Sequence, residues 1–219
     1  MTRLRWLWAL LVFVMTLLVE LPARWLLAPL PVPLAGISGS IWQGQVERLG
    51  DLGPLRWNWQ PWRLSAQASA GYQGQRWQLQ VSGWPWAWHA SLQPASDPHT
   101  FATGYRLAGQ WQGSIELQGR GTRCLSANGN LQGEGLALLA PWQLDLGQAR
   151  VTLDCRAGWK LAGQLSLAGQ HQADLAADLL ARQARLTGRV EPGAALQPVL
   201  VSAQWLAPGS SEVARSIRW

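Results

Sequence analysis

From Ile37 onward, apolar and polar residues alternate one by one over most of the chain. The clearest alternating runs are residues 56–60, 76–82, 114–118 and 149–154, followed by shorter ones at 159–161 and 164–167. Because successive side chains of a strand point to opposite faces, each run has one apolar face and one face of Gln, Arg, Ser or Glu. Glycine interrupts the runs at intervals typical of meanders and sandwiches. The sequence therefore predicts a mainly β protein with an antiparallel, strongly twisted or curved sheet, either an open sheet or an incomplete barrel.

Residues 172–186 fit two patterns. Leu175, Leu179 and Leu186 have the spacing of one face of a helix, whereas Leu175, Ala177 and Leu179 alternate with period two. Alternating runs flank the segment, which favours strand. The helical alternative stays open.

The first 27 residues are apolar without alternation. An uncharged run extends from Trp6 to Val19, and Arg3 and Arg5 precede it. A membrane-spanning helix needs about 20 mostly apolar residues, and flanking arginines mark the cytoplasmic side. Residues 1–27 are therefore predicted to be a cytoplasmic tip and a single transmembrane anchor. The N-terminus would be cytoplasmic, and the bulk of the protein would lie outside the cytoplasm.

Four charged residues near the ends of this anchor are candidates for the membrane interface: Arg3, Arg5, Glu20 and Arg24. Glu20 and Arg24 are four residues apart and could pair on one helix face. A cleaved signal peptide is the alternative to an anchor. Residues 21–23 match the small-residue cleavage pattern poorly, which favours an uncleaved segment.

The rest of the chain divides into a short Pro-rich linker at residues 28–36 and one Trp- and Gly-rich domain at residues 37–219. The two cysteines, Cys124 and Cys155, lie in this exported domain. An even number of cysteines outside the cytoplasm predicts a disulfide between them.

Charge and motif content exclude several function classes. The net charge is +6, but the basic residues are scattered singly, and Lys160 is the only lysine. Without a dense basic run, nucleic-acid binding is not expected. The three histidines, His89, His99 and His171, have no metal-ligand spacing, and nucleotide-binding and nucleophile motifs are absent. We therefore expect neither an enzyme nor a cofactor or metal.

Tryptophan is the most unusual component, with sixteen Trp against two Tyr and two Phe. Seven indoles lie close together in sequence: Trp57, Trp59, Trp62, Trp77, Trp84, Trp86 and Trp88. They could form a surface for sugar rings, a groove for acyl chains, or a core built on indoles. Trp57 and Trp59 share one strand face, as Trp84, Trp86 and Trp88 would in an extended run, and this favours a core. Pro61 and Pro85 make turns or edges, so some rings would be exposed.

Two segments, residues 39–44 and 55–64, resemble the type II secretion system protein N family (general secretion pathway protein N). That family has a Gly-x-Leu-Trp-x-Gly element followed by a Trp-rich, Pro-Trp-Arg-Leu-like strand. The matching residues here are Gly39, Trp42 and Gly44, then Trp57, Trp59, Pro61 and Trp62. Ile41 stands where Leu is common. The resemblance implies an accessory inner-membrane component of the machinery that moves folded proteins out of the periplasm. It implies contact with other secretion subunits and no catalytic residue.

Three functions are therefore weighed. A secretion component would bury most of its indoles and dock partners through an open sheet edge or one apolar patch. A membrane-tethered groove that binds or transfers lipid would have a continuous apolar channel. A glycan-binding module would present coplanar exposed indoles beside polar groups, for which Asn58, Gln60 and Gln78 are candidates.

Overall fold

The computed structural model describes residues 2–24, 33–50, 52–72, 74–95, 106–140, 142–156 and 158–219, with the backbone alone at 2–5, 18, 19 and 34. The side chains of Arg3 and Arg5 lie outside the described residues. So do residues 28–32, the first part of the expected linker.

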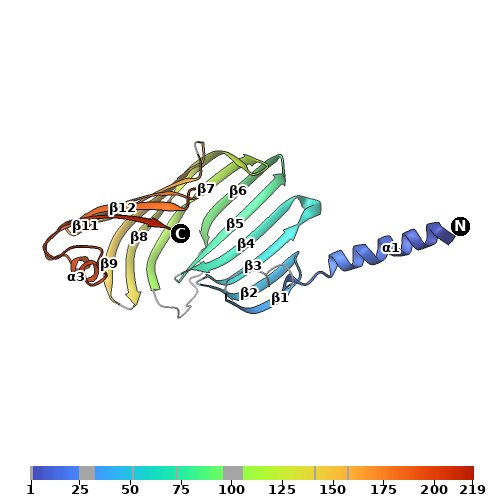
Figure 1. Ribbon diagram of the computed structural model, residues 1–219, viewed down its shortest axis with the longest axis horizontal. Helices are drawn as coiled ribbons and strands as arrows, with labels where there is room; N and C mark the ends of the chain where they lie inside the picture. Colours follow the sequence, from blue (N-terminus) through green and yellow to red (C-terminus); the bar gives the residue numbers. More distant parts are fainter. Residues whose placement is uncertain are drawn as a thin grey trace.

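Helix α1, Thr2–Val19, projects away from the rest of the molecule (Figure 1). Its side chains from Trp6 to Leu17 are all exposed. An 18-residue helix rises about 27 Å, a little less than the roughly 30 Å of a bilayer core. Within the described residues, no helix has both the length and the apolar character required to cross a membrane.

Helix α1 ends at Val19, whereas the predicted anchor extends to residue 27. The amide of Glu20 still donates to the Thr16 carbonyl at 3.0 Å, but Pro22 already forms a β-bridge with Ser40. Glu20 and Arg24 therefore do not lie on one turn of α1, so the helical spacing from which their pairing was predicted does not occur here.

In the described part of the chain, thirteen strands form one sheet in sequence order, and each is antiparallel to the next. The strands are β1 Leu34–Gly39, β2 Gln43–Leu49, β3 Leu52–Gln60, β4 Ser65–Tyr72, β5 Gln75–Trp84, β6 Ala87–Ala95, β7 Arg106–Arg120, β8 Arg123–Ala140, β9 Leu144–Asp154, β10 Lys160–Leu167, β11 His171–Asp178, β12 Gln183–Val190 and β13 Glu212–Arg218. A 3-10 turn, η1 Pro61–Arg63, joins β3 to β4, and helix α3, Leu196–Ser202, lies between β12 and β13. The sheet curves strongly and stays open, as predicted (Figure 1).

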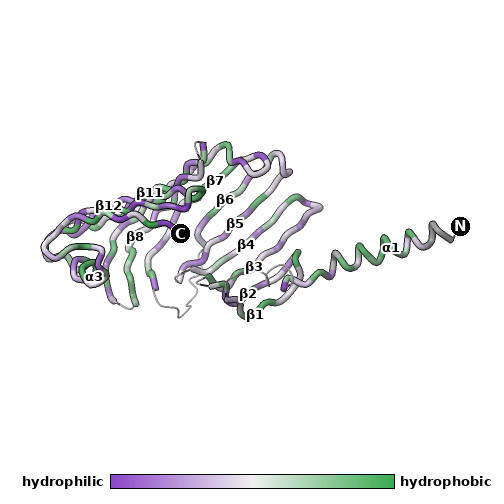
Figure 2. The backbone as a smooth tube through the Cα atoms, in the orientation of Figure 1, coloured by the Kyte–Doolittle hydropathy of each residue, from purple (hydrophilic) through white to green (hydrophobic). Residues whose placement is uncertain are grey.

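Strand register gives the sheet one apolar and one polar face. One row of paired residues across β2 to β7 is Gly44, Trp57, Ala68, Leu79, Leu92 and Ile115. The neighbouring row is Gln43, Asn58, Gln67, Gln80, Ser91 and Glu116. Figure 2 shows the same alternation as hydrophobic and hydrophilic colours succeeding each other along the strands. The period-two pattern of the sequence is therefore confirmed in the sheet.

Residues 172–186 are strands rather than a helix. They fall in β11 and β12, which are joined by a turn at residues 179–182. The Asp178 carboxylate accepts hydrogen bonds from the amides of Leu180 and Ala181 at 3.1 and 2.8 Å, and so fixes the turn.

The best-packed core lies beside α3, where β12 and β13 are connected. Val190, Ala194, Leu206 and Val213 are buried together there. Leu196, Leu200 and Val201 of α3 pack against this cluster. Elsewhere in the described residues, no second layer of helices covers the apolar face, and side chains such as Trp57 and Leu92 are only partly buried.

Candidate functional site

In an antiparallel sheet whose strands follow sequence order, alternate turns fall on the same edge. One set of turns contains residues 40–42, 61–64, 85–86, 121–122, 155–156, 158–159 and 179–182, and we call it the anchor-side edge. The opposite set contains residues 50, 74, 142–143, 168–170 and 191–211, and we call it the far edge. The two edges differ in their aromatic and charged residues. The anchor-side edge is the candidate site.

The anchor-side edge begins where α1 ends. The amide of Ile41 donates to the Leu21 carbonyl at 3.0 Å, and the bridge between Pro22 and Ser40 adds a second link. Ala23 is only 2% exposed. These contacts fix the C-terminal end of the helix to the turn between β1 and β2.

Backbone hydrogen bonds then join each of the next turns to its neighbour. The Trp59 amide donates to the Trp42 carbonyl at 2.6 Å. The Gly83 amide donates to the Leu64 carbonyl at 2.9 Å, and the Gly121 amide donates to the Pro85 carbonyl at 2.6 Å. The edge from β1 to β8 is therefore one connected strip of backbone. We call residues 40–42, 59–64, 83–88 and 119–124 the anchor-side strip.

The first Gly-Trp motif of the sequence builds the start of this strip. Gly39 pairs with Gly44, and the ring of Trp57 lies over Gly44, where a Cβ would come within 2.3 Å of the indole. The Trp57 indole N–H donates to the Ile41 carbonyl at 3.1 Å. Gly39 has a φ of +92°, which glycine adopts without steric cost. Both glycines are thus required by the fold at this corner.

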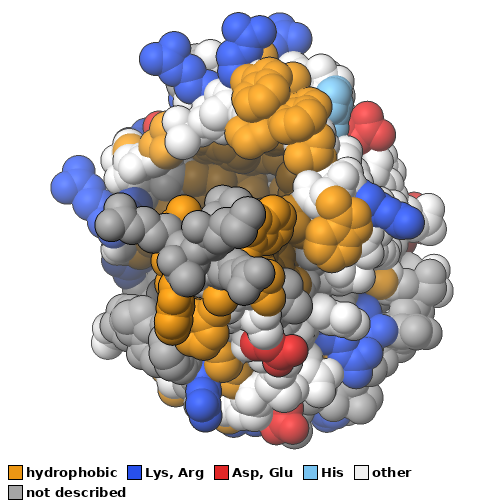
Figure 3. All heavy atoms as spheres, turned by 90° about the vertical axis from the view of Figure 1, so that its right-hand side faces the viewer, with side chains coloured by type: hydrophobic (Ala, Val, Ile, Leu, Met, Phe, Trp, Pro, Cys, Tyr) orange, Lys and Arg blue, Asp and Glu red, His pale blue; other side chains and the backbone are white. Residues whose placement is uncertain are grey.

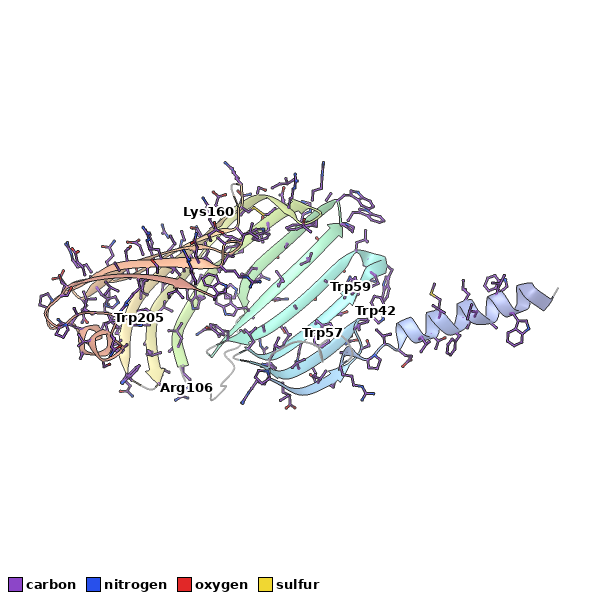
Figure 4. The ribbon with its side chains drawn as sticks, viewed as in Figure 1. Trp42, Trp57, Trp59, Arg106, Lys160 and Trp205 are labelled. Atoms are coloured by element: carbon purple, nitrogen blue, oxygen red, sulfur yellow. A yellow bond between two sulfur atoms is a disulfide. The ribbon has the colours of Figure 1, made fainter. Side chains whose placement is uncertain are left out.

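The second part of the motif carries exposed indoles. The ring of Trp42 packs on that of Trp59 with centroids 5.1 Å apart, and both lie near Trp57 at the end of the sheet nearest α1 (Figure 4). Pro61 starts η1, in which Trp62 projects with 76% of its surface exposed. The motif residues therefore combine a packed corner with an open aromatic surface.

Pro85 lies in a turn, as predicted, so Trp84, Trp86 and Trp88 do not form one extended run. β5 ends at Trp84 and β6 begins at Ala87, because Pro85 and Trp86 form the turn between them. The two exposed indoles stack on each other with centroids 4.8 Å apart and an interplanar angle of 13°.

The strip is basic as well as aromatic. Arg63, Arg120 and Arg123 are exposed, and the strip contains neither Asp nor Glu. Figure 3 views the molecule from the side where α1 leaves the sheet. It shows hydrophobic side chains around a hollow, with Lys and Arg side chains projecting at the periphery.

A family model describing type II secretion system (T2SS) protein N matches residues 31–211, most of the chain. The chain belongs to the type II secretion system protein N family. Membership associates it with the type II secretion machinery. Searches of the curated proteins and of the solved structures each return no significant match.

Beyond the motif that resembles the protein N family, the structure contains a second indole-on-glycine corner. The ring of Trp88 lies over Gly119, where a Cβ would meet it at 2.1 Å, and its N–H donates to the Gly121 carbonyl at 2.9 Å. Trp57 and Gly44 have the same arrangement on the other side of β4 and β5. Sequence analysis missed this corner because Trp88 and Gly119 are far apart in the chain, and only the pairing of β6 with β7 brings them together.

Two of the three polar residues expected beside the indoles for glycan binding, Asn58 and Gln78, point to the other face of the sheet. Asn58 and Gln78 follow Trp57 and Trp77 directly in their strands, so their side chains lie on the opposite, polar face. Trp84 and Trp86 cover one face of each other, which leaves no flat platform of adjacent rings. In the part of the chain that the structure describes, no three His, Cys, Asp or Glu residues form a group that could hold a metal.

The predicted disulfide is present and lies on the anchor-side edge. Cys124 and Cys155 are joined, with their Cα atoms 5.6 Å apart. The ladder between β8 and β9 begins only at the pair of Leu131 and Val151. The disulfide therefore links the ends of β8 and β9 beyond that ladder, where strand pairing does not hold them.

Proposed function

We propose that this chain is an accessory inner-membrane component of the type II secretion machinery and acts by protein–protein contact in the periplasm. The observation that carries this proposal is the family match across residues 31–211, which covers nearly the whole sheet. A curved sheet with long polar and apolar faces is a scaffold for binding, so a non-enzymatic role is part of the proposal.

The proposed anchor is the N-terminal segment of residues 1–27. Support comes from α1, whose side chains between Trp6 and Leu17 are all exposed and therefore gain nothing from packing on the sheet. Transfer of such a helix from water to lipid is favourable, since each buried apolar side chain contributes about 1.5–3 kcal/mol. Arg3 and Arg5 precede the apolar run, which favours a cytoplasmic N-terminus and a periplasmic sheet.

The open edge of β13 is the surface we propose for a secretion partner. β13 pairs with β12 on one side, and Val213 is its only buried residue among the seven described. An edge strand with unpaired N–H and C=O groups can accept a strand from another chain. At the other end of the sheet, the β1–β2 turn is already tied to the residues that follow α1.

In-cell photo-crosslinking tests the proposal. A photoreactive residue at Ser216 on β13 is compared with one at Gln172 on the polar face of β11, both exposed. After irradiation, the anchored protein is purified in mild detergent, and its proteins and lipids are identified by mass spectrometry. We expect secretion subunits to be crosslinked from position 216 and not from position 172. Equal crosslinking from both positions, or none from 216, would contradict docking at this edge.

A groove that binds lipid is the second candidate, and one observation favours it. The apolar face runs across the sheet, and Figure 3 shows a hollow lined by hydrophobic side chains at the anchor side. The same purification distinguishes the two functions. Stoichiometric phospholipid without any secretion subunit would favour the groove over the docking component.

A further inference from the structure

The short helix and its rigid link to the sheet constrain where the anchor-side strip can lie. The inference rests on the proposed function in one respect, namely that α1 enters the inner membrane. The uncharged run from Trp6 to Val19 would rise only about 21 Å as a helix, against a hydrocarbon core of roughly 30 Å. A segment shorter than the bilayer draws its flanking residues into the membrane interface.

The residues that follow α1 are bonded to the turn between β1 and β2. The hydrogen bond from Ile41 to Leu21 and the bridge from Ser40 to Pro22 leave no free linker at this point. The next turns are joined to the first by backbone hydrogen bonds. A helix end drawn into the interface therefore brings the whole strip with it.

The strip has the composition that suits this position. Trp59, Trp62, Trp84 and Trp86 are 46%, 76%, 52% and 60% exposed. Indoles with an apolar body and one N–H are enriched where a membrane meets water. Exposed arginines nearby are attracted to anionic headgroups, and no carboxylate of the strip opposes them.

We propose that the anchor-side strip lies in the membrane–water interface, with its indoles among the lipid headgroups and Arg63, Arg120 and Arg123 on anionic phospholipid. The mouth of the hollow seen in Figure 3 then faces the bilayer surface. The far edge, with α3, then points away from the membrane.

A fluorescence experiment on the full chain tests this placement. An environment-sensitive fluorescent amino acid replaces Ala87 beside Trp86, or Ala168 in a far-edge turn, and both alanines are exposed. Each protein is reconstituted into vesicles of phosphatidylcholine containing one-quarter phosphatidylglycerol, with a nitroxide on a fraction of the headgroups. We expect the label at position 87 to be quenched and the label at position 168 to remain unquenched.

Charge variants sharpen the test. Replacing Arg63, Arg120 and Arg123 with Gln removes three basic groups, each worth about a fivefold preference for an anionic surface, so the docking equilibrium constant should fall by on the order of 100-fold. The matched control replaces Arg48, Arg106 and Arg189, exposed arginines near the far ends of β2, β7 and β12. Quenching at position 87 should fall with the first set and persist with the second.

The outcomes separate the inference from the proposed function. If alkaline carbonate extracts the full chain from the vesicles, the anchor does not insert, and both proposals fall. If the chain resists extraction but position 87 is quenched no more than position 168, only the interfacial placement is overturned. Quenching that is equal in pure phosphatidylcholine and unchanged by the Arg63, Arg120 and Arg123 variant would overturn the assignment to anionic lipid.

Discussion

The two edges of one sheet bury large apolar residues to different degrees. At the far edge, Val190, Leu206 and Val213 are 3–6% exposed, because α3 packs against them. At the anchor-side edge, Trp62 and Trp84 are 76% and 52% exposed. The same strands form both edges, so the chain has the means to bury such residues. The far edge exposes Trp142 and Trp205 as well, at 43% and 40%, but the indoles of the anchor-side edge are the more exposed. This excess indicates a surface that meets another apolar phase.

The two edges also differ in their charged residues. On the far side, the Arg189 guanidinium lies 3.4 Å from the Glu212 carboxylate. The anchor-side strip contains Arg63, Arg120 and Arg123 and no acidic residue. The edge with the more exposed indoles therefore also carries positive charge without nearby acidic residues, a combination that suits an anionic lipid surface.

Removing the disulfide is expected to have the largest effect on stability. The double variant Cys124→Ser, Cys155→Ser opens a link with a sequence separation of 31 residues, which corresponds to about 4 kcal/mol on the loop-entropy model. The melting temperature of the full chain in mild detergent should fall by roughly 10 °C. A melting temperature unchanged by the double variant would show that the anchor-side edge does not depend on this link.

The packing contrast between the edges can be tested with two leucines. Leu206→Ala removes a side chain that is 3% exposed in the far-edge cluster and should cost about 3 kcal/mol. Leu180→Ala, in the anchor-side turn of β11 and β12, removes one that is 70% exposed and should cost less than about 0.5 kcal/mol. Thermal unfolding of both variants measures the difference. Similar losses would mean that the far edge is no better packed than the anchor-side edge.

The glycine beneath Trp57 gives a smaller expected effect. Gly44→Ala places a Cβ 2.3 Å from the indole ring, so ring or backbone must shift, at a cost of about 2 kcal/mol. Gly163→Ala is the matched control, since its Cβ would meet Leu175 at an ordinary 3.5 Å. We expect the melting temperature to fall for Gly44→Ala only. An equal fall in both would assign the loss to the general effect of changing a strand glycine.

Much of the sheet could be predicted from the sequence, because its information is local. The period-two alternation identifies the strands and assigns side chains to faces, and residues 172–186 follow it even though their leucines also fit a helix. The residues around Trp84 carry two local signals that disagree. Trp84, Trp86 and Trp88 alternate like one strand, whereas Pro85 predicts the turn that the structure has.

The anchor-side strip could not be predicted, because it depends on strand order. Arg63 and Arg120 fall on one edge only when every strand pairs with the next in sequence. The predicted anchor extended beyond α1, since Trp25, Leu26 and Leu27 are apolar again after the charged Glu20, whereas the helix ends at Val19 and Pro22 bridges to Ser40. Only one corner of the strip, formed by Gly44 and Trp57, could be identified from the sequence, because both residues belong to the family motif.

The smallest expected effect concerns the ion pair at the far edge. Arg189 and Glu212 have 68% and 74% of their side-chain surface exposed, and solvent screens such a pair. Arg189→Gln should therefore change stability by less than about 0.5 kcal/mol, within the error of most melting curves. A loss well above that value would mean that the far edge relies on charge pairing as well as on the packing around Leu206. The contrast between an edge held by apolar packing and one held by turn-to-turn hydrogen bonds would then need revision.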